Sequence, residues 1–219
     1  MPRLLFEKKG NAIWISHLDL MRVFQRSFKR AGLPLTHTQG FNPRPSVSIA
    51  LPLSVGIESS CELLDFDLDG EPIPEAEIKR RLNEKLVEGV RVLDVYTGGQ
   101  KIKYLALLDC CLTLQYDGGV PEGAAEKITA LLSREEVTVT KKSKSGNTEQ
   151  NIIPMIRKAA VRETNQNTLT VQARICCQNP SLNPMQIAFA IEKYLPEYTP
   201  SFVECSRLEI YDQKEQQFR

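Results

Sequence analysis

The order of strand-like and helix-like patterns is the feature that most limits how this chain folds. Apolar alternation in the first half predicts strands, and 3.6-residue periodicity between capping residues predicts helices. The predicted strands are 3–8, 46–50, 62–68 and 91–96, with 12–15 as a short hairpin partner, and the predicted helices are 17–31 and 75–86. This order, βαββαβ, indicates an α+β fold.

A linker of Gly and Lys residues, 98–103, precedes a second series of the same kind. Its predicted strands are 107–116, 137–142, 168–177 and 207–212, its predicted helices are 122–132 and 184–195, and 151–162 is predicted as extended or mixed. We therefore expect two tandem ferredoxin-like (βαββαβ-type) units, an N-terminal domain at 1–98 and a C-terminal domain at 104–219. A single larger α+β domain with one continuous sheet is the alternative.

Charge is distributed unevenly, although the net charge of the 219 residues is only +1. Residues 1–50 are rich in Lys and Arg, whereas 51–97 are rich in Asp and Glu. Such a domain is able to face nucleic acid on one side and a protein on the other, with an acidic flank from Glu58 to Asp69 for the partner. The alternative is two complementary surfaces on a neutral protein.

Neither a membrane span nor a signal peptide is evident, so we expect a cytoplasmic protein with no membrane contact. The six cysteines include two adjacent pairs, Cys110–Cys111 and Cys176–Cys177, within apolar runs that read as strands. Neighbours on a strand point to opposite faces, so these pairs suit neither a disulfide nor one metal ion. No CxxC spacing occurs. We expect no metal and no cofactor.

The most informative stretch runs from Trp14 to Gly56. Ser16 is placed to cap a helix, and Gly32 with Pro34 ends it. One face of the helix is apolar and the other carries Arg22, Arg26, Lys29 and Arg30. The polar loop that follows contains His37, Gln39, Phe41, Asn42 and Arg44 between a glycine and two prolines.

These residue types suit binding of an anion. An arginine forks onto a phosphate, amides read a base edge, and a phenylalanine stacks on a base. The predicted substrate- or RNA-binding residues are Arg22, Arg26, Arg30, His37, Gln39, Phe41, Asn42 and Arg44. The structural alternative is a stiff turn in which Phe41 fills the core and Arg44 pairs with an acid downstream.

Two segments, ISHLDLMRVFQRSFKRAGLPL at 15–35 and TQGFNPRPSVSIALPLSVGIES at 38–59, carry a family resemblance. They resemble the N-terminal signature of the radical-SAM-linked protein family, a bacterial domain of unknown function. The resemblance is close over 3–97 and looser over 98–219. It implies a protein encoded beside, or fused to, a radical SAM enzyme, but it implies no reaction.

The sequence contains no catalytic constellation, so we assign no catalytic residues. We expect a non-catalytic accessory module that binds substrate for a separately encoded radical SAM enzyme, acting on RNA or a ribosome-related component. One alternative is a metal-independent RNA endonuclease of the tandem-ferredoxin type that uses His17 or His37 as acid or base. The other is a protein–protein adaptor that makes no nucleic-acid contact.

Overall fold

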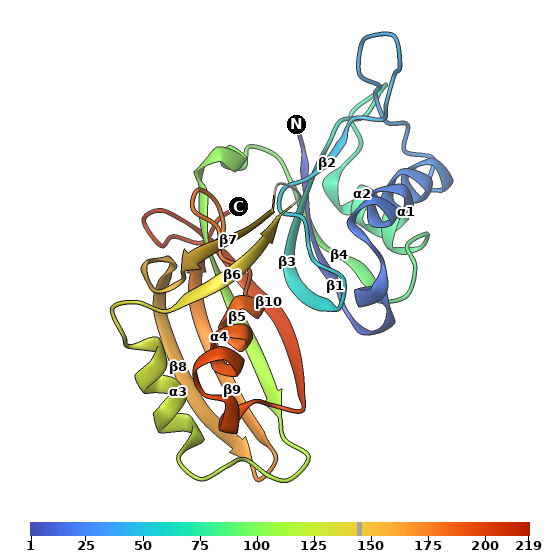
Figure 1. The fold of residues 1–219 in the computed structure, drawn as a ribbon. Helices are drawn as coiled ribbons and strands as arrows, with labels where there is room; N and C mark the ends of the chain where they lie inside the picture. The colour runs from blue at the N-terminus through green and yellow to red at the C-terminus, as the bar shows by residue number, and fades with distance from the viewer. Residues whose placement is uncertain (144–145) are drawn as a thin grey trace. The chain divides into compact units, whose positions relative to one another are not determined.

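The protein is described from a computed structural model that covers residues 1–143 and 146–219 (Figure 1). It is an α+β protein with four α-helices in the described residues. The chain divides into two compact units, Met1–Ile102 together with Arg219, and Lys103–Phe218. Each unit is described separately below.

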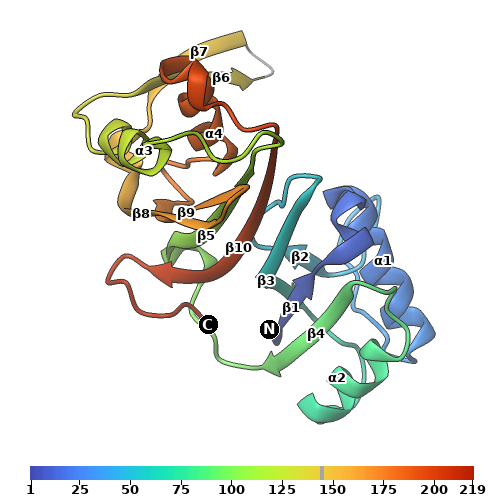
Figure 2. The ribbon, with the colours of Figure 1, turned by 90° about the horizontal axis from the view of Figure 1, so that it is seen from below.

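Unit 1 contains four strands and two α-helices. In chain order these are β1 (Arg3–Lys8), α1 (His17–Arg30), β2 (Val47–Ile49), β3 (Ile57–Phe66), α2 (Glu75–Asn83) and β4 (Val90–Tyr96). Its strands lie in the order β4-β1-β3-β2, and every neighbouring pair is antiparallel. Both helices cover the same face of this sheet (Figure 2).

The hydrophobic core of unit 1 lies between that face and the helices. Phe6 of β1 and Phe24 of α1 are fully buried, with ring centroids 4.7 Å apart. Phe28 of α1 likewise meets Phe66 of β3 at 5.0 Å. Aromatic pairs at such distances add to the free energy of burial. The apolar side of α1 is therefore fixed to the sheet, and its opposite side is left for solvent.

The strand predicted at 12–15 is wrong, because this segment belongs to a 3₁₀ helix, Gly10–Trp14. Gly10 has a φ of +54°, a conformation that glycine adopts readily, and it turns the chain between β1 and α1. The buried Lys8 Nζ donates a hydrogen bond to the Ile13 carbonyl oxygen at 3.0 Å. This bond holds the turn against β1.

In its described residues, unit 2 contains six strands and two α-helices. They are β5 (Leu105–Gln115), α3 (Ala124–Leu132), β6 (Thr138–Ser143), β7 (Gly146–Asn151), β8 (Ile156–Asn165), β9 (Thr168–Cys176), α4 (Met185–Tyr194) and β10 (Phe202–Asp212). Four strands form an antiparallel arrangement in the order β10-β5-β9-β8. Strands β6 and β7 pair only with each other and lie beside α4 (Figure 2).

The β6–β7 hairpin confirms one predicted strand and adds another. The strand predicted at 137–142 is one arm of this hairpin, and β7, with the polar sequence GNTEQN, was not predicted at all. None of the residues of β7 is fully buried, so no hydrophobic alternation marks it. The mixed segment predicted at 151–162 consists of a short 3₁₀ helix, Ile153–Met155, followed by β8. The sequence also predicts a cationic hairpin tip with Lys141, Lys142 and Lys144, of which Lys144 lies outside the described residues.

The observed bounds of α2 and β3 differ from the predicted bounds, each for an identifiable reason. Helix α2 ends at Asn83, before the predicted 86, and the Asn83 side chain forms two hydrogen bonds with the backbone of Val92 in β4. Strand β3 begins at Ile57, before the predicted 62. After Ile57 the strand continues with Glu58 and two serines, which carry a weak strand signal, but Ser59 pairs with Lys8 across the sheet.

Candidate nucleic-acid interface

Helix α1 begins as the sequence predicted. The Ser16 Oγ accepts a hydrogen bond from the Asp19 backbone N–H at 3.2 Å and donates one to the Asp19 carboxylate at 2.7 Å. The hydrogen bond from Ser16, followed by that from Arg22, lowers the pKa of Asp19 below its usual value. A carboxylate held at the first turn is favourable at the positive end of the helix dipole.

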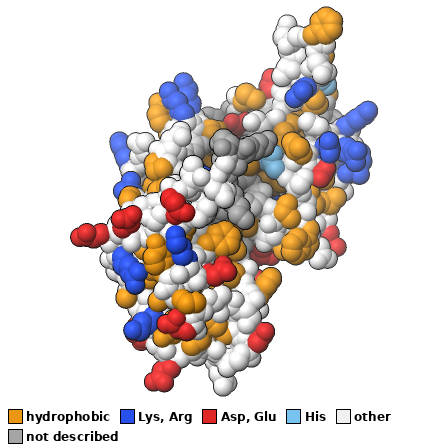
Figure 3. All heavy atoms as spheres, in the orientation of Figure 1, with side chains coloured by type: hydrophobic (Ala, Val, Ile, Leu, Met, Phe, Trp, Pro, Cys, Tyr) orange, Lys and Arg blue, Asp and Glu red, His pale blue; other side chains and the backbone are white. Residues whose placement is uncertain are grey.

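The four cations of α1 are exposed, and Figure 3 shows Lys and Arg side chains gathered over this helix. Two of them are already engaged. Arg22 forms an ion pair with Asp19 at 2.7 Å. The Arg30 Nη2 donates to the Lys85 carbonyl oxygen at 3.1 Å, just beyond α2. The side chains of Arg26 and Lys29 form no hydrogen bond or ion pair within the described residues, so they are the cations most available to a ligand.

Lys29 and Arg30 leave the helix in different directions, since adjacent helical residues are about 100° apart. Arg30 turns toward the end of α2, as its bond to Lys85 shows. Lys29 turns the other way and, with Gln25, lines a cavity of about 440 Å³ beside the loop after α1. The sequence also predicts that Arg22, Arg26, Lys29, Arg30 and Arg44 converge on one face. Arg30 instead turns toward the end of α2 and does not line the cavity.

The cavity is lined by residues of α1 and of the loop that follows it, the two features that the sequence pointed to separately. Its lining consists of Gln25, Lys29, Gly32, Leu33, Pro34, Leu35, His37 and Pro45. The floor is largely apolar, and His37 comes from the predicted binding loop. Gln25 and the segment 32–35 were not predicted as site residues. The only sequence signal for Gln25 is its position one helical turn before Lys29.

The loop between α1 and β2 is an ordered projection. The Thr38 backbone N–H donates to the Arg44 carbonyl oxygen at 2.8 Å, and the Arg44 N–H donates to Thr38 Oγ1 at 3.0 Å. Residues His37 and Pro45 form an isolated antiparallel bridge below them. Gly40, at the tip, has a φ of +132° and open space around it. The segment extends away from the rest of unit 1 (Figure 1).

The side chains of this loop face solvent. Phe41 is completely exposed, with a relative accessibility of 110%. The structural alternative, in which Phe41 fills the core, is therefore excluded. Gln39, Asn42 and Arg44 are also exposed, and their side chains form no hydrogen bond or ion pair in the part of the chain that the structure describes. Arg44 thus pairs with none of the described acids.

The two histidines differ in setting. His17 is the first residue of α1, and its Nδ1 is buried without a hydrogen-bond partner in the described structure. His37 is exposed and lines the cavity next to Gln25 and Lys29. At 1.5 Å per helical residue, His17 is separated from Gln25 and Lys29 along the axis by roughly 12–18 Å. This separation is too large for an acid–base pair acting on one phosphate.

The predicted acidic flank is largely occupied inside unit 1. A Glu58 carboxylate oxygen accepts from the Gly10 N–H at 3.1 Å, and Asp67 accepts from the Thr36 hydroxyl at 3.2 Å. Asp65 forms an ion pair with Arg3, and Glu62 is buried. The carboxylates from Glu58 to Asp67 therefore hold unit 1 together, and they do not form a free acidic surface.

The cysteines are free thiols, five of them buried. Burial raises the pKa of Cys177 and of Cys205 to about 12, so these thiols are protonated and unreactive at neutral pH. The described residues contain no cluster of three or more potential metal ligands. Among the same residues, no helix is long and apolar enough to cross a membrane.

The geometry defines an α+β protein with an exposed aromatic loop next to a cationic helix. The chain belongs to a bacterial family described as "Uncharacterized protein conserved in bacteria (DUF2344)", whose model matches residues 2–184. No curated protein matches the sequence.

Two solved structures align with this chain at low sequence identity. A chain of a Cbf5–Nop10–Gar1 complex aligns with a TM-score of 0.54 and 10% identity, over 95% of this chain and 48% of that chain. A chain of an archaeal box H/ACA sRNP Nop10–Cbf5 complex aligns with a TM-score of 0.47 and 9% identity, over 94% and 46%. This chain thus spans about half the length of the structures it matches. At these identities the likeness concerns the fold alone.

Proposed function

We propose that this protein is a non-catalytic accessory module that binds single-stranded RNA through the 37–44 loop and the exposed side of α1. The observation that carries the proposal is Phe41, a phenylalanine fully exposed at the tip of a hydrogen-bonded loop. An exposed aromatic ring has no folding role there. Base stacking on such a ring contributes about 1–3 kcal/mol to binding and tolerates any base.

The surrounding side chains suit the rest of a nucleotide. Arg44, two residues from Asn42 on the same loop, is available for a phosphate, and Gln39 and Asn42 have donors and acceptors for a base edge. Arg26 and Lys29 extend this cationic surface along α1. Phosphate contacts hold a strand in register, and base contacts select the sequence.

We also propose that the two units are tandem ferredoxin-like domains, 1–98 and 104–219, joined by the linker 98–103. In unit 1 the strands occur in the spatial order fourth-first-third-second. Unit 2 has the same order once the β6–β7 hairpin is set aside. The recurrence of one βαββαβ topology, antiparallel throughout, supports this assignment.

We retain a separately encoded radical SAM enzyme as the proposed partner, in the cytoplasm. Its support is the resemblance of the segments 15–35 and 38–59 to the radical-SAM-linked family. The endonuclease alternative is less favoured because His17 and His37 are associated with opposite ends of α1. The adaptor without RNA contact remains the competing function, and the following experiment separates the two.

The test is binding of fluorescently labelled RNA from the native source to the full chain and to Phe41→Ala. We expect Phe41→Ala to weaken binding about tenfold, as loss of one stacked base predicts, with unchanged stability. Phe202→Ala is the matched control, because Phe202 is an exposed phenylalanine of unit 2 with 56% accessibility. If the wild-type chain binds no RNA more tightly than about 0.1 mM at physiological salt, the range of non-specific contact, the adaptor function replaces this proposal.

A further inference from the structure

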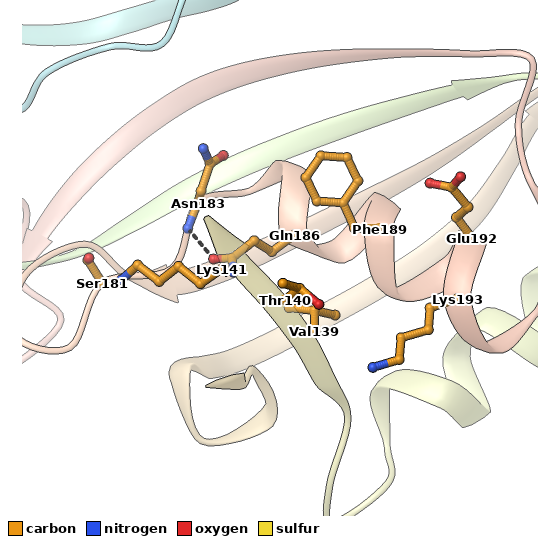
Figure 4. Close-up of a pocket in the computed structure, with 9 residues that line it drawn as sticks. All are labelled: Val139, Thr140, Lys141, Ser181, Asn183, Gln186, Phe189, Glu192 and Lys193. Atoms are coloured by element: carbon orange, nitrogen blue, oxygen red, sulfur yellow. Dashed lines mark hydrogen bonds between the residues drawn. The ribbon is translucent and has the colours of Figure 1, made fainter. Parts of the chain in front are cut away.

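Unit 2 contains a larger cavity that the proposed function does not use. It has a volume of about 800 Å³ and lies between strand β6 and helix α4 (Figure 4). Its lining consists of Val139, Thr140, Lys141, Ser181, Asn183, Gln186, Phe189, Glu192 and Lys193. A cavity of this size is within the range of small-molecule sites.

Gln186 supplies the main indication of a ligand. It is 95% buried, since its accessibility is 5%. Its Oε1 accepts a hydrogen bond from the Asn183 N–H at 3.2 Å, while Asn183 Oδ1 accepts from the Met185 N–H at 3.0 Å. This reciprocal cap at the start of α4 identifies the remaining amide atom, Nε2, as the donor.

The Gln186 Nε2 is buried and has no hydrogen-bond partner in the described structure. A buried donor left without a partner destabilises a protein by about 1–3 kcal/mol. Because Nε2 has almost no accessible surface, an acceptor on a ligand in the cavity would satisfy it when the amide turns toward the cavity on binding. The first requirement on the ligand is therefore a carbonyl oxygen or a ring nitrogen that reaches the start of α4.

The remaining lining side chains differ between the two ends of the cavity. Figure 4 shows Lys141 and Ser181 at one end, Glu192 at the other, and the Phe189 ring between them. Phe189 is 51% exposed, although the helix positions on either side of it are buried. Lys193 is engaged, since its Nζ donates to the Thr138 carbonyl oxygen at 2.9 Å. Lys141 is thus the lining cation with no hydrogen bond or ion pair within the described residues.

We propose that this cavity binds one nucleotide whose base carries an exocyclic amine, either free or as part of an RNA strand. The phosphate lies at the Lys141 end, the base stacks on Phe189, and an acceptor on the base receives the Gln186 Nε2–H. The exocyclic amine donates to the Glu192 carboxylate at the far end, as carboxylates do with cytosine. Uracil lacks this amine. The site goes beyond the loop of unit 1 and stands even if that loop binds no RNA.

The test uses the full chain labelled with ¹⁵N and titrated with CMP, GMP, AMP and UMP. The expected result is saturable shifting of the Gln186 side-chain amide signals, identified by their absence in Gln186→Glu. CMP, GMP and AMP are expected to bind at least about tenfold more tightly than UMP, because a paired hydrogen bond to a charged group contributes about 1.5–3 kcal/mol. Equal binding of UMP, or shifts with inorganic phosphate alone that match those with nucleotides, overturns the base assignment.

Gln186→Glu and Gln186→Met both remove the unpartnered donor. The first keeps the Oε1 cap on Asn183 but buries a negative charge, whereas the second is neutral and so excludes simple repulsion of the phosphate. Both are expected to lower nucleotide affinity at least about tenfold, with some loss of stability. Phe189→Ala should also weaken binding, and Phe189→Tyr should restore it. Lys141→Ala removes the lysine at the phosphate end of the cavity and should also weaken nucleotide binding. Its control is Lys127→Ala, which removes an exposed lysine of α3 outside the cavity. Full affinity in Gln186→Glu overturns the proposal.

The source of the nucleotide is decided by comparing CMP with a short cytidine-containing RNA. Tighter binding of the RNA, lost in Gln186→Glu but retained in Phe41→Ala, assigns the site to an RNA strand. Equal binding of the two assigns it to a free nucleotide. Loss of RNA binding in Phe41→Ala with intact CMP binding concerns the loop of unit 1 only, so failures of the two proposals are distinguishable.

Discussion

The guanidinium of Arg174 forks onto the carboxylate of Asp109, with Nε 2.7 Å from Oδ1 and Nη2 2.9 Å from Oδ2. These residues face each other on β9 and β5. Tyr211 of β10 completes the group, because its ring centroid lies 3.8 Å from the guanidinium and its hydroxyl donates to Asp109 at 2.9 Å. Arg174 is buried, so this pair is more than a surface contact.

Unit 1 has a corresponding pair. Arg3 of β1 and Asp65 of β3 also face each other, and Tyr96 of β4 faces Arg3 from the other side. In both units the Arg–Asp pair joins the first and third strands, and a tyrosine comes from the fourth. The residue types on the first and third strands are exchanged between the units. The shared strand order places the three residue types on the same strands of each unit. Because Arg and Asp are exchanged, the same residue types do not recur in the same order along the two halves of the sequence.

Replacing Asp109 by Ala is expected to destabilise the protein by about 1.5–3 kcal/mol, because the buried Arg174 guanidinium loses its bidentate carboxylate and keeps only the ion pair with Glu215 at 2.6 Å. Urea denaturation followed by circular dichroism measures the change. Glu163→Ala is the control, since Glu163 is an exposed carboxylate on β8 and its loss should shift stability by less than about 0.5 kcal/mol. Equal stability of the two variants would show that the pair contributes nothing.

The same pair predicts a pH dependence. Burial raises the pKa of Asp109, but hydrogen bonds from Arg174 and Tyr211 outweigh it, so the pKa lies below the usual 3.8. A depressed pKa means that the stabilisation is present above pH 3.8 and is lost as pH falls through the folded-state value. The stability difference between wild type and Asp109→Asn should therefore shrink as the pH drops below 3.8. A difference that stays constant down to pH 2 contradicts this assignment.

Substitutions of the α1 cations are expected to have two kinds of effect, one on RNA binding alone and one on both binding and stability. Arg26→Glu should weaken RNA binding and flatten its dependence on salt by about one to two phosphate contacts, without loss of stability, because Arg26 has no bond to lose. Arg30→Glu should also destabilise the fold by about 1 kcal/mol, since it removes the hydrogen bond to Lys85. Salt titrations of binding and urea denaturation measure the two effects. Identical profiles for both variants would contradict the assignment of Arg30, and not Arg26, to a bond that holds the fold.

The burial of the cysteines predicts the order in which they react with a thiol reagent. Burial raises the pKa of Cys110, Cys177 and Cys205, whereas Cys111, whose pKa burial also raises, is only partly buried. Native protein treated with a maleimide at pH 7 should therefore be modified slowly and first at Cys111, and urea should expose all six thiols. Peptide mass spectrometry identifies the modified site. Rapid labelling of Cys110 would contradict the buried arrangement of β5.

Much of the fold was predictable because its signals are local. The Ser16 cap, the apolar face of α1 and the stop at Gly32 depend on residues within a few positions of one another. The order of strands and helices followed from periodicity, and it led to most elements of both units. Strand β7 was missed because its residues bury little, so its pattern carries no information about pairing.

Local patterns in the sequence account for the two faces of α1, the residue types of the 37–44 loop and most of the element order. The availability of those side chains depends on the folded chain. Within the described residues the side chains of Phe41 and Arg26 have no bonding partner, whereas Arg30 and the carboxylates of Glu58 and Asp65 are engaged by partners distant in sequence. The Gln186 Nε2 donor, which has no partner in the same part of the chain, is likewise a property of packing. The physical reason is that propensity and capping act over a few residues, whereas burial and hydrogen bonding depend on groups that only the folded chain brings together.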